Sequence, residues 1–350
     1  MNNWQRLLTN TTLQKNLKRR ETIIAAMRAF FVSRGYREID VPLLAPALPA
    51  ESYLEVFETT LLNRHRQQRP AYLTTSPEMY LKKLLVGGIG NCFAITKSFR
   101  NTEDLSKTHL PEFSLLEWYK VGVDYIDLMG ETEDLLLSVY SKLHGNKKPV
   151  LQYQGQTIDL AKPWERLSVV EAFERYAKLD LTQILEREPM VEVAHKRGYL
   201  VEETTTWEEI FHQIYLNEVE PKLGKDRPTI LYDFPSSMAA LAKKKDDDPR
   251  FAERFEVFIG GLELGDCYSE LTDWQEQDVR FKKEVEERRR LGKTDHPYDK
   301  DFIEALKVGM PQCAGLALGI DRVVMLFCDA SKIDDVVYFP ASQLWKTQTS

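Results

Sequence analysis

Residues 98–119 constrain the fold most strongly, because they read as two strands joined by a short polar loop. Arg100 ends the first strand and Phe113 begins the second. A guanidinium can bind a phosphate through two parallel hydrogen bonds, and an aromatic ring can stack on a base. Beyond the ring, Glu117 and Tyr119 share one face of a strand, since side chains alternate with period two. The pattern indicates a nucleotide site beside an acidic patch that suits an amine; an ordinary hairpin with a polar loop is the alternative.

A second hairpin, at residues 254–270, places two carboxylates on one face. Gly260-Gly261 between strand-like runs predicts a two-residue turn, which sets Phe258 opposite Glu263. Glu256 then lies diagonally across from Glu263, at roughly 7 Å or less between Cβ atoms. Two like charges so close favour a cation between them, and Mg²⁺ bound by carboxylates and nucleotide phosphates fits. A solvent-facing acidic surface explains this segment equally well.

Three further segments have clear local patterns. Apolar residues recur at three- and four-residue spacing over 17–34, which predicts an amphipathic helix. Residues 36–44 then read as a strand, which Val41-Pro42 restricts to the edge of a sheet. Ser76-Pro77-Glu78 predicts the start of another helix, because serine caps, proline suits the first turn and glutamate favours the positive end of the helix dipole.

Composition and charge narrow the class of protein. The 350 residues are 43% hydrophobic and 29% charged, and no apolar run approaches the ~20 residues that a membrane span needs. The polar N-terminus has no signal-peptide core, and the four cysteines show no metal-ligand spacing, so we expect reduced thiols in the cytoplasm. The net charge of −7 argues against a nucleic-acid binder. Arg288–Arg290 follow three glutamates and read as a solvated helix face.

Together these segments resemble the catalytic domain of class II aminoacyl-tRNA synthetases. Residues 17–44 resemble motif 1, residues 93–120 motif 2 and residues 315–328 motif 3, in which Arg322 falls in the first turn of a helix, a favourable place to meet phosphate. The resemblance implies an α+β fold with a mainly antiparallel sheet flanked by helices, in a homodimer. It also implies a single catalytic domain over residues 1–350, with no anticodon-binding domain ahead of motif 1.

Within that family the chain is most similar to the lysyl branch. Motif 2 of that branch has Arg-Asn-Glu, then His-Asn-Pro-Glu-Phe and Glu-x-Tyr; here Thr102 and Leu110 depart from the pattern. The resemblance implies ATP and Mg²⁺ as cofactors, Arg100 as the catalytic residue that stabilises the α-phosphate, and Glu256 and Glu263 as metal ligands. It implies ATP contacts at Arg100, Asn101, Thr102, Glu103, His109, Leu110, Phe113, Glu263, Leu264, Gly319 and Arg322.

The same resemblance implies an amino-acid pocket in which carboxylates hold amines. Its expected contacts are Ser76, Pro77, Glu78, Glu117, Tyr119, Asp266, Glu270 and Ala317. Simple alternation puts Glu270 on the opposite face from Glu263, so this interpretation requires a bulge, for which Gly265 is the best place. Asp266-Cys267 stands where the family has Asn-Gly, and it adds a negative charge beside the pocket.

Finer features resemble the elongation factor P lysine ligases, which attach (R)-β-lysine to a lysine of that factor. Residues 75–78 and 304–311 match their pattern, and Ala317 replaces a glycine of the synthetases. We therefore expect ATP-dependent activation of a lysine-like amino acid, (R)-β-lysine, and transfer to elongation factor P rather than to tRNA, without membrane association. Two alternatives stay open: a lysyl-tRNA synthetase-like enzyme that charges tRNA, and a catalytically silent regulatory paralogue, which typically loses a phosphate-binding arginine or a metal carboxylate.

Overall fold

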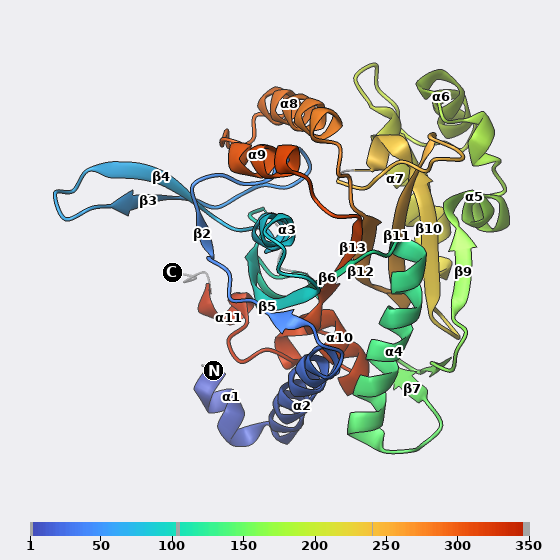
Figure 1. The fold of residues 1–350 in the computed structure, drawn as a ribbon. Helices are drawn as coiled ribbons and strands as arrows, with labels where there is room; N and C mark the ends of the chain where they lie inside the picture. The colour runs from blue at the N-terminus through green and yellow to red at the C-terminus, as the bar shows by residue number, and fades with distance from the viewer. Residues whose placement is uncertain (1–2, 103–105, 240, 346–350) are drawn as a thin grey trace, which may run out of the picture.

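The computed structural model describes residues 3–102, 106–239 and 241–345. Within these residues, an eight-stranded sheet lies at the centre in the order β1-β5-β6-β13-β12-β11-β10-β9 (Figure 1). The edge pairs β1–β5 and β9–β10 are parallel, and the other neighbours are antiparallel, so the expected mainly antiparallel sheet is confirmed. In sheet order the strands span Arg37–Glu38, Cys92–Phe99, Glu112–Val121, Cys313–Gly319, Leu262–Ser269, Phe251–Ile259, Thr229–Pro235 and Glu165–Ser168.

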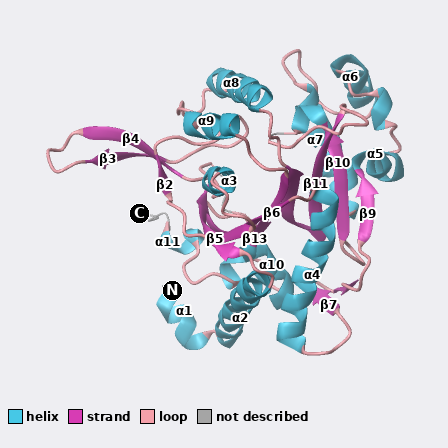
Figure 2. Ribbon diagram, in the orientation of Figure 1, coloured by secondary structure: helices cyan, strands magenta, loops and turns pink. Residues whose placement is uncertain are grey.

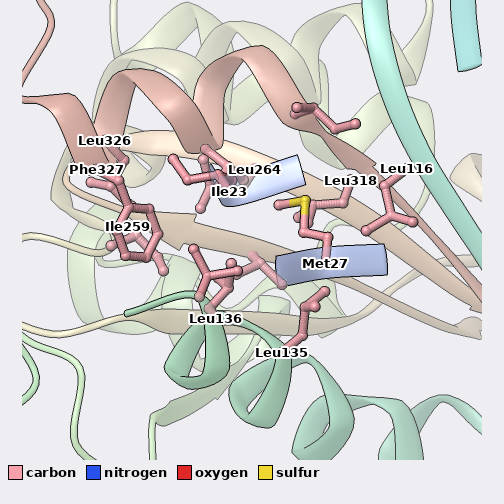
Figure 3. Close-up of a cluster of buried hydrophobic side chains, with 14 of the residues drawn as sticks. Ile23, Met27, Leu116, Leu135, Leu136, Ile259, Leu264, Leu318, Leu326 and Phe327 are labelled. Carbon is pink, nitrogen blue, oxygen red and sulfur yellow. The ribbon is translucent and has the colours of Figure 1, made fainter. Parts of the chain in front are cut away.

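Three helices cover one face of this sheet and bury the main core. They are α2 (Thr11–Ser33), α4 (Tyr125–His144) and α10 (Ile320–Cys328). Figure 3 shows Met27 of α2 and Leu135 of α4 close to Leu318 of β13, and all three are fully buried. Each such side chain contributes about 1.5–3 kcal/mol when it leaves water. Because this face is filled with apolar side chains, a polar ligand must bind on the other one.

The first helix confirms one prediction, and the segment after it corrects another. Helix α2 includes the helix predicted over 17–34 as far as Ser33 and begins earlier, at Thr11. The single strand predicted over 36–44 is wrong, because only Arg37–Glu38 pairs in the main sheet and Leu44–Ala45 forms β2 in a separate sheet. Pro42 explains the interruption, since proline has no N–H to donate to a neighbouring strand.

The other face of the sheet carries a second layer of helices, seen above the sheet in Figure 2. It consists of α3 (Glu78–Val86), α8 (Trp274–Arg290) and α9 (Lys300–Val308). Helix α3 begins where Ser76-Pro77-Glu78 predicts, and Ser76 Oγ accepts the N–H of Glu78 at 3.3 Å. The solvated face expected at the end of α8 is wrong for Arg288, which is 2% exposed because it binds the carbonyl oxygens of Glu51 and Leu54.

The remaining elements lie at the edges of these layers. A small sheet in the order β2-β4-β3 projects as a hairpin at the left of Figure 1. A second core lies beside β9 and β10, where the rings of Trp207 and Phe211 stack 5.2 Å apart. Within the described residues, no helix combines the length and apolar character needed to cross a bilayer. The α-helices and strands not yet given are α1 (Asn3–Thr9), β3 (Glu58–Leu62), β4 (Gln68–Leu73), β7 (Val150–Tyr153), β8 (Gln156–Asp159), α5 (Val169–Ala172), α6 (Arg187–Lys196), α7 (Trp207–Ile214) and α11 (Ala341–Leu344).

Candidate active site

A cavity of about 1600 Å³ opens over strands β6, β11, β12 and β13. Helices α7 and α8 and the loop at residues 50–54 form parts of its wall. The volume exceeds that of most small-ligand pockets and suits a nucleotide together with an amino acid. Most of the site residues expected from the sequence line this one cavity: Ser76, Glu78, Arg100, His109, Leu110, Phe113, Glu117, Tyr119, Glu256, Glu263, Leu264, Asp266, Glu270, Ala317, Gly319 and Arg322.

A β-bulge directs the second hairpin toward this cavity. The Gly260-Gly261 turn has φ angles of +65° and +76°, and Phe258 pairs with Glu263 as predicted. The register then shifts by one residue before Gly265, where a bulge was predicted. A Cβ at Gly265 would lie only 2.7 Å from the carbonyl oxygen of the neighbouring strand, so glycine permits this close approach. The bulge brings Glu270 to the same side of the sheet as Glu263, and both line the cavity.

Acidic side chains gather at one end of the cavity, where three elements meet. Glu117 and Tyr119 lie on β6, Glu270 follows β12, and Glu78 begins α3. Tyr119 donates its hydroxyl proton to Glu117 Oε1 at 2.7 Å. Gly315 on β13 makes room for this group, because a Cβ there would clash with the Tyr119 ring and lie 2.9 Å from Glu270 Oε1. We call these four polar residues, together with Lys82, the amine pocket.

Lys82 lies between two of these carboxylates, and the sequence analysis did not anticipate it. Its ammonium forms ion pairs with Glu78 and Glu270, and its side chain is 1% exposed. Burial disfavours the charged ammonium, but the two carboxylates outweigh this effect and raise the pKa of Lys82. Burial raises the pKa of Glu270 to about 8, and Lys82 opposes that rise. The i,i+4 spacing of Glu78 and Lys82 is visible in the sequence, but it is equally typical of exposed helix surfaces.

Arg100 faces the cavity next to the amine pocket. Its Cζ atom lies 5.3 Å from the centre of the Phe113 ring, so the guanidinium and the ring expected at a nucleotide site are in contact. The Nε atom of Arg100 is buried and has no hydrogen-bond partner among the described residues. A buried donor without a partner is unfavourable. The arrangement therefore fits an anionic ligand such as a phosphate.

Arg322 lies in the first turn of α10, as predicted, and links strand β12 to the loop that carries His109. Its Nη1 atom donates to the carbonyl oxygen of Glu263 at 2.7 Å, and its Nη2 atom lies 2.7 Å from Nε2 of His109. The preceding residue, Asp321, is buried and forms an ion pair with Arg20 of α2. This ion pair joins α2, in the segment that resembles motif 1, to α10, in the segment that resembles motif 3.

Arg254 changes the expected charge of the hairpin. Its guanidinium binds Asp266 through two hydrogen bonds of 3.0 Å each and Glu256 Oε1 at 2.7 Å. Tyr268 donates its hydroxyl proton to Asp266 at 2.7 Å. Asp266 lines the cavity, as expected, but its negative charge has a partner. A cross-strand arginine neutralises it, and single-sequence patterns do not reveal such a partner.

The carboxylates expected to bind Mg²⁺ lie in a crowded acidic region. Burial raises the pKa of Glu256 well above its usual range, with Arg254 opposing and Glu263 adding to the rise. Glu220, which carries no sequence signal, also has its pKa raised by burial and by Glu263. Among the described residues, no group of three or more His, Cys, Asp or Glu is arranged to hold a metal ion. The donors fit a Mg²⁺ that two carboxylates share with phosphate oxygens, as is usual for a nucleotide-bound metal.

Some expected contacts lie elsewhere. Three of them do not line the cavity: Pro77, Asn101 and Thr102. The N–H of Asn101 instead donates to the Glu55 carbonyl oxygen at 2.9 Å. Leu264 and Leu110 bury their side chains in the main core, as Figure 3 shows for Leu264, so their backbone atoms are the parts that can meet a nucleotide. Glu103 lies outside the described residues.

Comparison with known proteins agrees with this arrangement. A family model described as tRNA synthetases class II (D, K and N) matches residues 1–343. The chain is 38% identical over 336 residues to a lysine–tRNA ligase of Magnetococcus marinus, 37% over 336 residues to one of Pelotomaculum thermopropionicum and 38% over 334 residues to one of Vesicomyosocius okutanii. Each match covers 95% of the chain, but only 65%, 65% and 66% of the respective relative. The chain thus belongs to the class II tRNA synthetases of the D, K and N group, a family of ligases that use ATP to form an adenylate.

Proposed function

We propose that this chain uses ATP to activate a lysine-like amino acid, (R)-β-lysine, as an adenylate and transfers the acyl group to a lysine side chain of elongation factor P. The observation that carries the proposal is that the three carboxylates of the amine pocket and Arg100 line one cavity. It supports the binding of a substrate whose amines lie at one end and whose carboxylate meets a phosphate at the other.

The charge of the amine pocket supports a substrate with two amines. When all groups are ionised, Glu78, Glu117, Glu270 and Lys82 leave two formal negative charges. Burial raises the pKa of Glu117 well above its usual range, and the Glu78 carboxylate adds to the rise, so the pocket is short of positive charge. The two ammonium groups of a diamino acid would stabilise the ionised forms of Glu117 and Glu270 and neutralise the pocket, whereas a single amine would stabilise only one of them.

In the first step, the substrate carboxylate attacks the α-phosphorus of ATP, an O–P bond forms and pyrophosphate leaves. Arg100 would stabilise negative charge on that phosphate, Phe113 would stack on the adenine, and Arg322 would bind the γ-phosphate. Mg²⁺, when bound by Glu256 and Glu263 with phosphate oxygens, supplies positive charge against the polyphosphate. The protein contributes positioning and electrostatic stabilisation.

Two features support (R)-β-lysine and a protein acceptor. Ala317 pairs with Glu117 on one side and Asp266 on the other, so its methyl group lies in the floor of the cavity, where synthetases have glycine. The methyl group changes the shape of the pocket floor, which supports a preference for an amino acid whose backbone differs from that of α-lysine. The net charge of −7 disfavours extensive contacts with tRNA phosphates, which need clustered lysine and arginine.

Charging of tRNA is the second candidate function. The relatives are named lysine–tRNA ligases, which favours activation of lysine and its transfer to tRNA. A silent regulatory role has less support, because the residues that such paralogues typically lose all line the cavity: Arg100, Glu256, Glu263 and Arg322.

We also propose a homodimer in the cytoplasm. Apolar side chains stay exposed on β2 and β3, at Leu44, Leu61 and Leu62. They lie at or near the end of residues 17–44, which resemble motif 1, the motif that builds the dimer interface in this family. Exposed apolar surface commonly marks an interaction site. The four cysteines are free thiols, which supports a reducing compartment. A sedimentation mass near 40.6 kDa, that of one chain, would contradict the dimer.

The acceptor can be tested with radiolabelled amino acid. The protein is incubated with ATP, Mg²⁺, labelled lysine or (R)-β-lysine, and either elongation factor P or total tRNA. We expect label on a lysine of the factor, in a bond that resists mild alkali because it is an amide. Label in alkali-labile RNA, with none on the factor, would instead establish the tRNA-charging function.

A further inference from the structure

An irregular loop at residues 50–54 forms part of the cavity wall. Helix α8 holds this loop, because Arg288 donates to the carbonyl oxygens of Glu51 at 2.8 Å and of Leu54 at 2.6 Å. Arg288 is itself buried, so these hydrogen bonds fix the backbone of the loop. The side chain of Glu51 therefore has a defined place on the cavity wall.

Glu51 lies at the junction between the two ends of the cavity. Its carboxylate accepts a hydrogen bond from the Tyr53 hydroxyl at 2.8 Å. It also interacts electrostatically with Arg100, at the phosphate end, and with Glu78, in the amine pocket. Burial raises the pKa of Glu51 to about 7; the carboxylates of Glu78 and Glu284 add to the rise, while Arg100 and Tyr53 oppose it.

Most carboxylates at the base of the cavity belong to ion pairs, whereas Glu51 and Glu117 are bound by tyrosine hydroxyls. None of the ion pairs formed among the described residues includes Glu51, and its side-chain partner is a neutral phenol. The ion-paired carboxylates are Glu78 and Glu270 on Lys82, Glu256 and Asp266 on Arg254, and Glu263 on Arg322. Glu117 differs from Glu51 because it is 2% exposed inside the amine pocket, whereas Glu51 is half-buried on the cavity wall. Glu51 is thus free to exchange a proton with an incoming group.

We propose that Glu51 is the general base of the transfer step and takes a proton from the ε-ammonium of the acceptor lysine, with Tyr53 as its positioning residue. The proposal rests on the proposed function, because it concerns transfer to an amine. A lysine amine has an ordinary pKa of about 10.4, so it arrives protonated and cannot attack. A base that titrates near the working pH is the most effective partner for such a proton.

The step balances without any further reactant. The ammonium gives one proton to the Glu51 carboxylate, and the neutral nitrogen attacks the carbonyl carbon of the adenylate. A C–N bond forms, the C–O bond to the phosphate breaks, and AMP leaves with the bonding electron pair. The nitrogen loses its second proton to a phosphate oxygen of the departing AMP, which leaves a neutral amide. Glu51 then releases its proton to water.

The variant Glu51→Gln tests this role, because glutamine keeps the acceptor for Tyr53 and removes the base. Each protein is given ATP, Mg²⁺, labelled (R)-β-lysine and one of two acceptors, elongation factor P or hydroxylamine. Hydroxylamine is unprotonated at neutral pH and needs no base. We expect the ratio of amide to hydroxamate to fall about 10²- to 10⁴-fold in Glu51→Gln. Glu276→Gln, which alters an ion-paired carboxylate on the same cavity wall, should leave the ratio unchanged.

Three results would overturn the assignment. An unchanged ratio in Glu51→Gln would show that another group removes the proton. Equal loss of amide and hydroxamate would make Glu51 a structural residue. Hydroxamate without any amide on the factor in the wild type would refute the proposed acceptor, and with it this step. A supporting readout comes from Tyr53→Phe: losing its hydrogen bond should raise the pKa of Glu51 and move the pH profile of transfer upward, whereas a purely structural role would leave the profile in place.

Discussion

Replacing Lys82 with methionine should destabilise the protein in a pH-dependent manner. Methionine keeps most of the volume but removes the charge that two buried carboxylates share. Removing one partner of a buried ion pair typically costs about 3–5 kcal/mol, because the other charge is left uncompensated. We therefore expect Lys82→Met to lower the free energy of unfolding by about 3–5 kcal/mol at pH 9.

The loss of unfolding free energy in Lys82→Met should shrink as the pH falls, because Glu270 becomes protonated. Its pKa is raised to about 8 in the folded protein, so the folded state holds this proton up to higher pH than the unfolded state does. Stability linked to that proton is present at low pH and is lost as the pH rises through about 8. At pH 6 Glu270 is already neutral, and the missing ammonium matters less. At pH 9 Lys82 is still charged in the wild type, because its own pKa is raised.

Urea unfolding at pH 6 and pH 9 measures this difference, with Lys83→Met as the matched control. Lys83 is the next residue on the same helix and pairs with Asp299 at 2.8 Å, but its side chain is 22% exposed. Its replacement should cost less than that of Lys82, because Lys83 is less buried, and the cost should be the same at the two pH values. A loss below 1 kcal/mol for Lys82→Met at pH 9, or the same loss at both pH values, would refute the electrostatic account of the amine pocket.

The remaining predictions concern adenylate formation. Arg100→Ala should slow ATP–pyrophosphate exchange by at least 10²–10³-fold, since charge stabilisation of about 3–4 kcal/mol is lost; near-normal exchange would remove Arg100 from its role. Glu270→Gln should raise the amino-acid KM far more than the ATP KM, because it removes a charge-assisted contact worth about 1.5–3 kcal/mol. Equal effects on both KM values would show that Glu270 stabilises the fold or the metal site rather than binding the amino acid. Ala317→Gly should shift preference toward α-lysine by no more than roughly 10- to 200-fold, and unchanged preference would exclude residue 317 from selection.

The sequence predicted those features of the fold and the site that depend on residues close together in the chain, such as turns, strand alternation and helix starts. Gly260-Gly261 specifies a turn by its φ angles, and that turn fixes which residue faces Glu263. Alternation along a strand placed Glu117 and Tyr119 together, and a helix start placed Arg322. The need for a bulge also followed from alternation, because Glu270 could reach the cavity in no other regular way.

The partners that decide the charge of the site were beyond the reach of sequence patterns. Lys82 reads as one half of an ordinary surface pair with Glu78, and only the fold brings Glu270 to it. Arg254 neutralises Asp266 across two strands, and Arg288 turns inward because a loop far away in the sequence offers carbonyl oxygens. Such contacts depend on tertiary packing, which charge patterns along a chain do not encode.

The most direct test of the account is ATP–pyrophosphate exchange by the wild-type protein across a panel of amino acids. The panel contains α-lysine, both enantiomers of β-lysine, and norleucine and glutamine as analogues without a second amine. We predict exchange with the diamino acids, fastest with (R)-β-lysine, and little with the others, because the amine pocket needs two ammonium groups. Exchange that is equally fast with norleucine would contradict the role of the amine pocket, and absence of exchange with every amino acid would contradict adenylate formation itself.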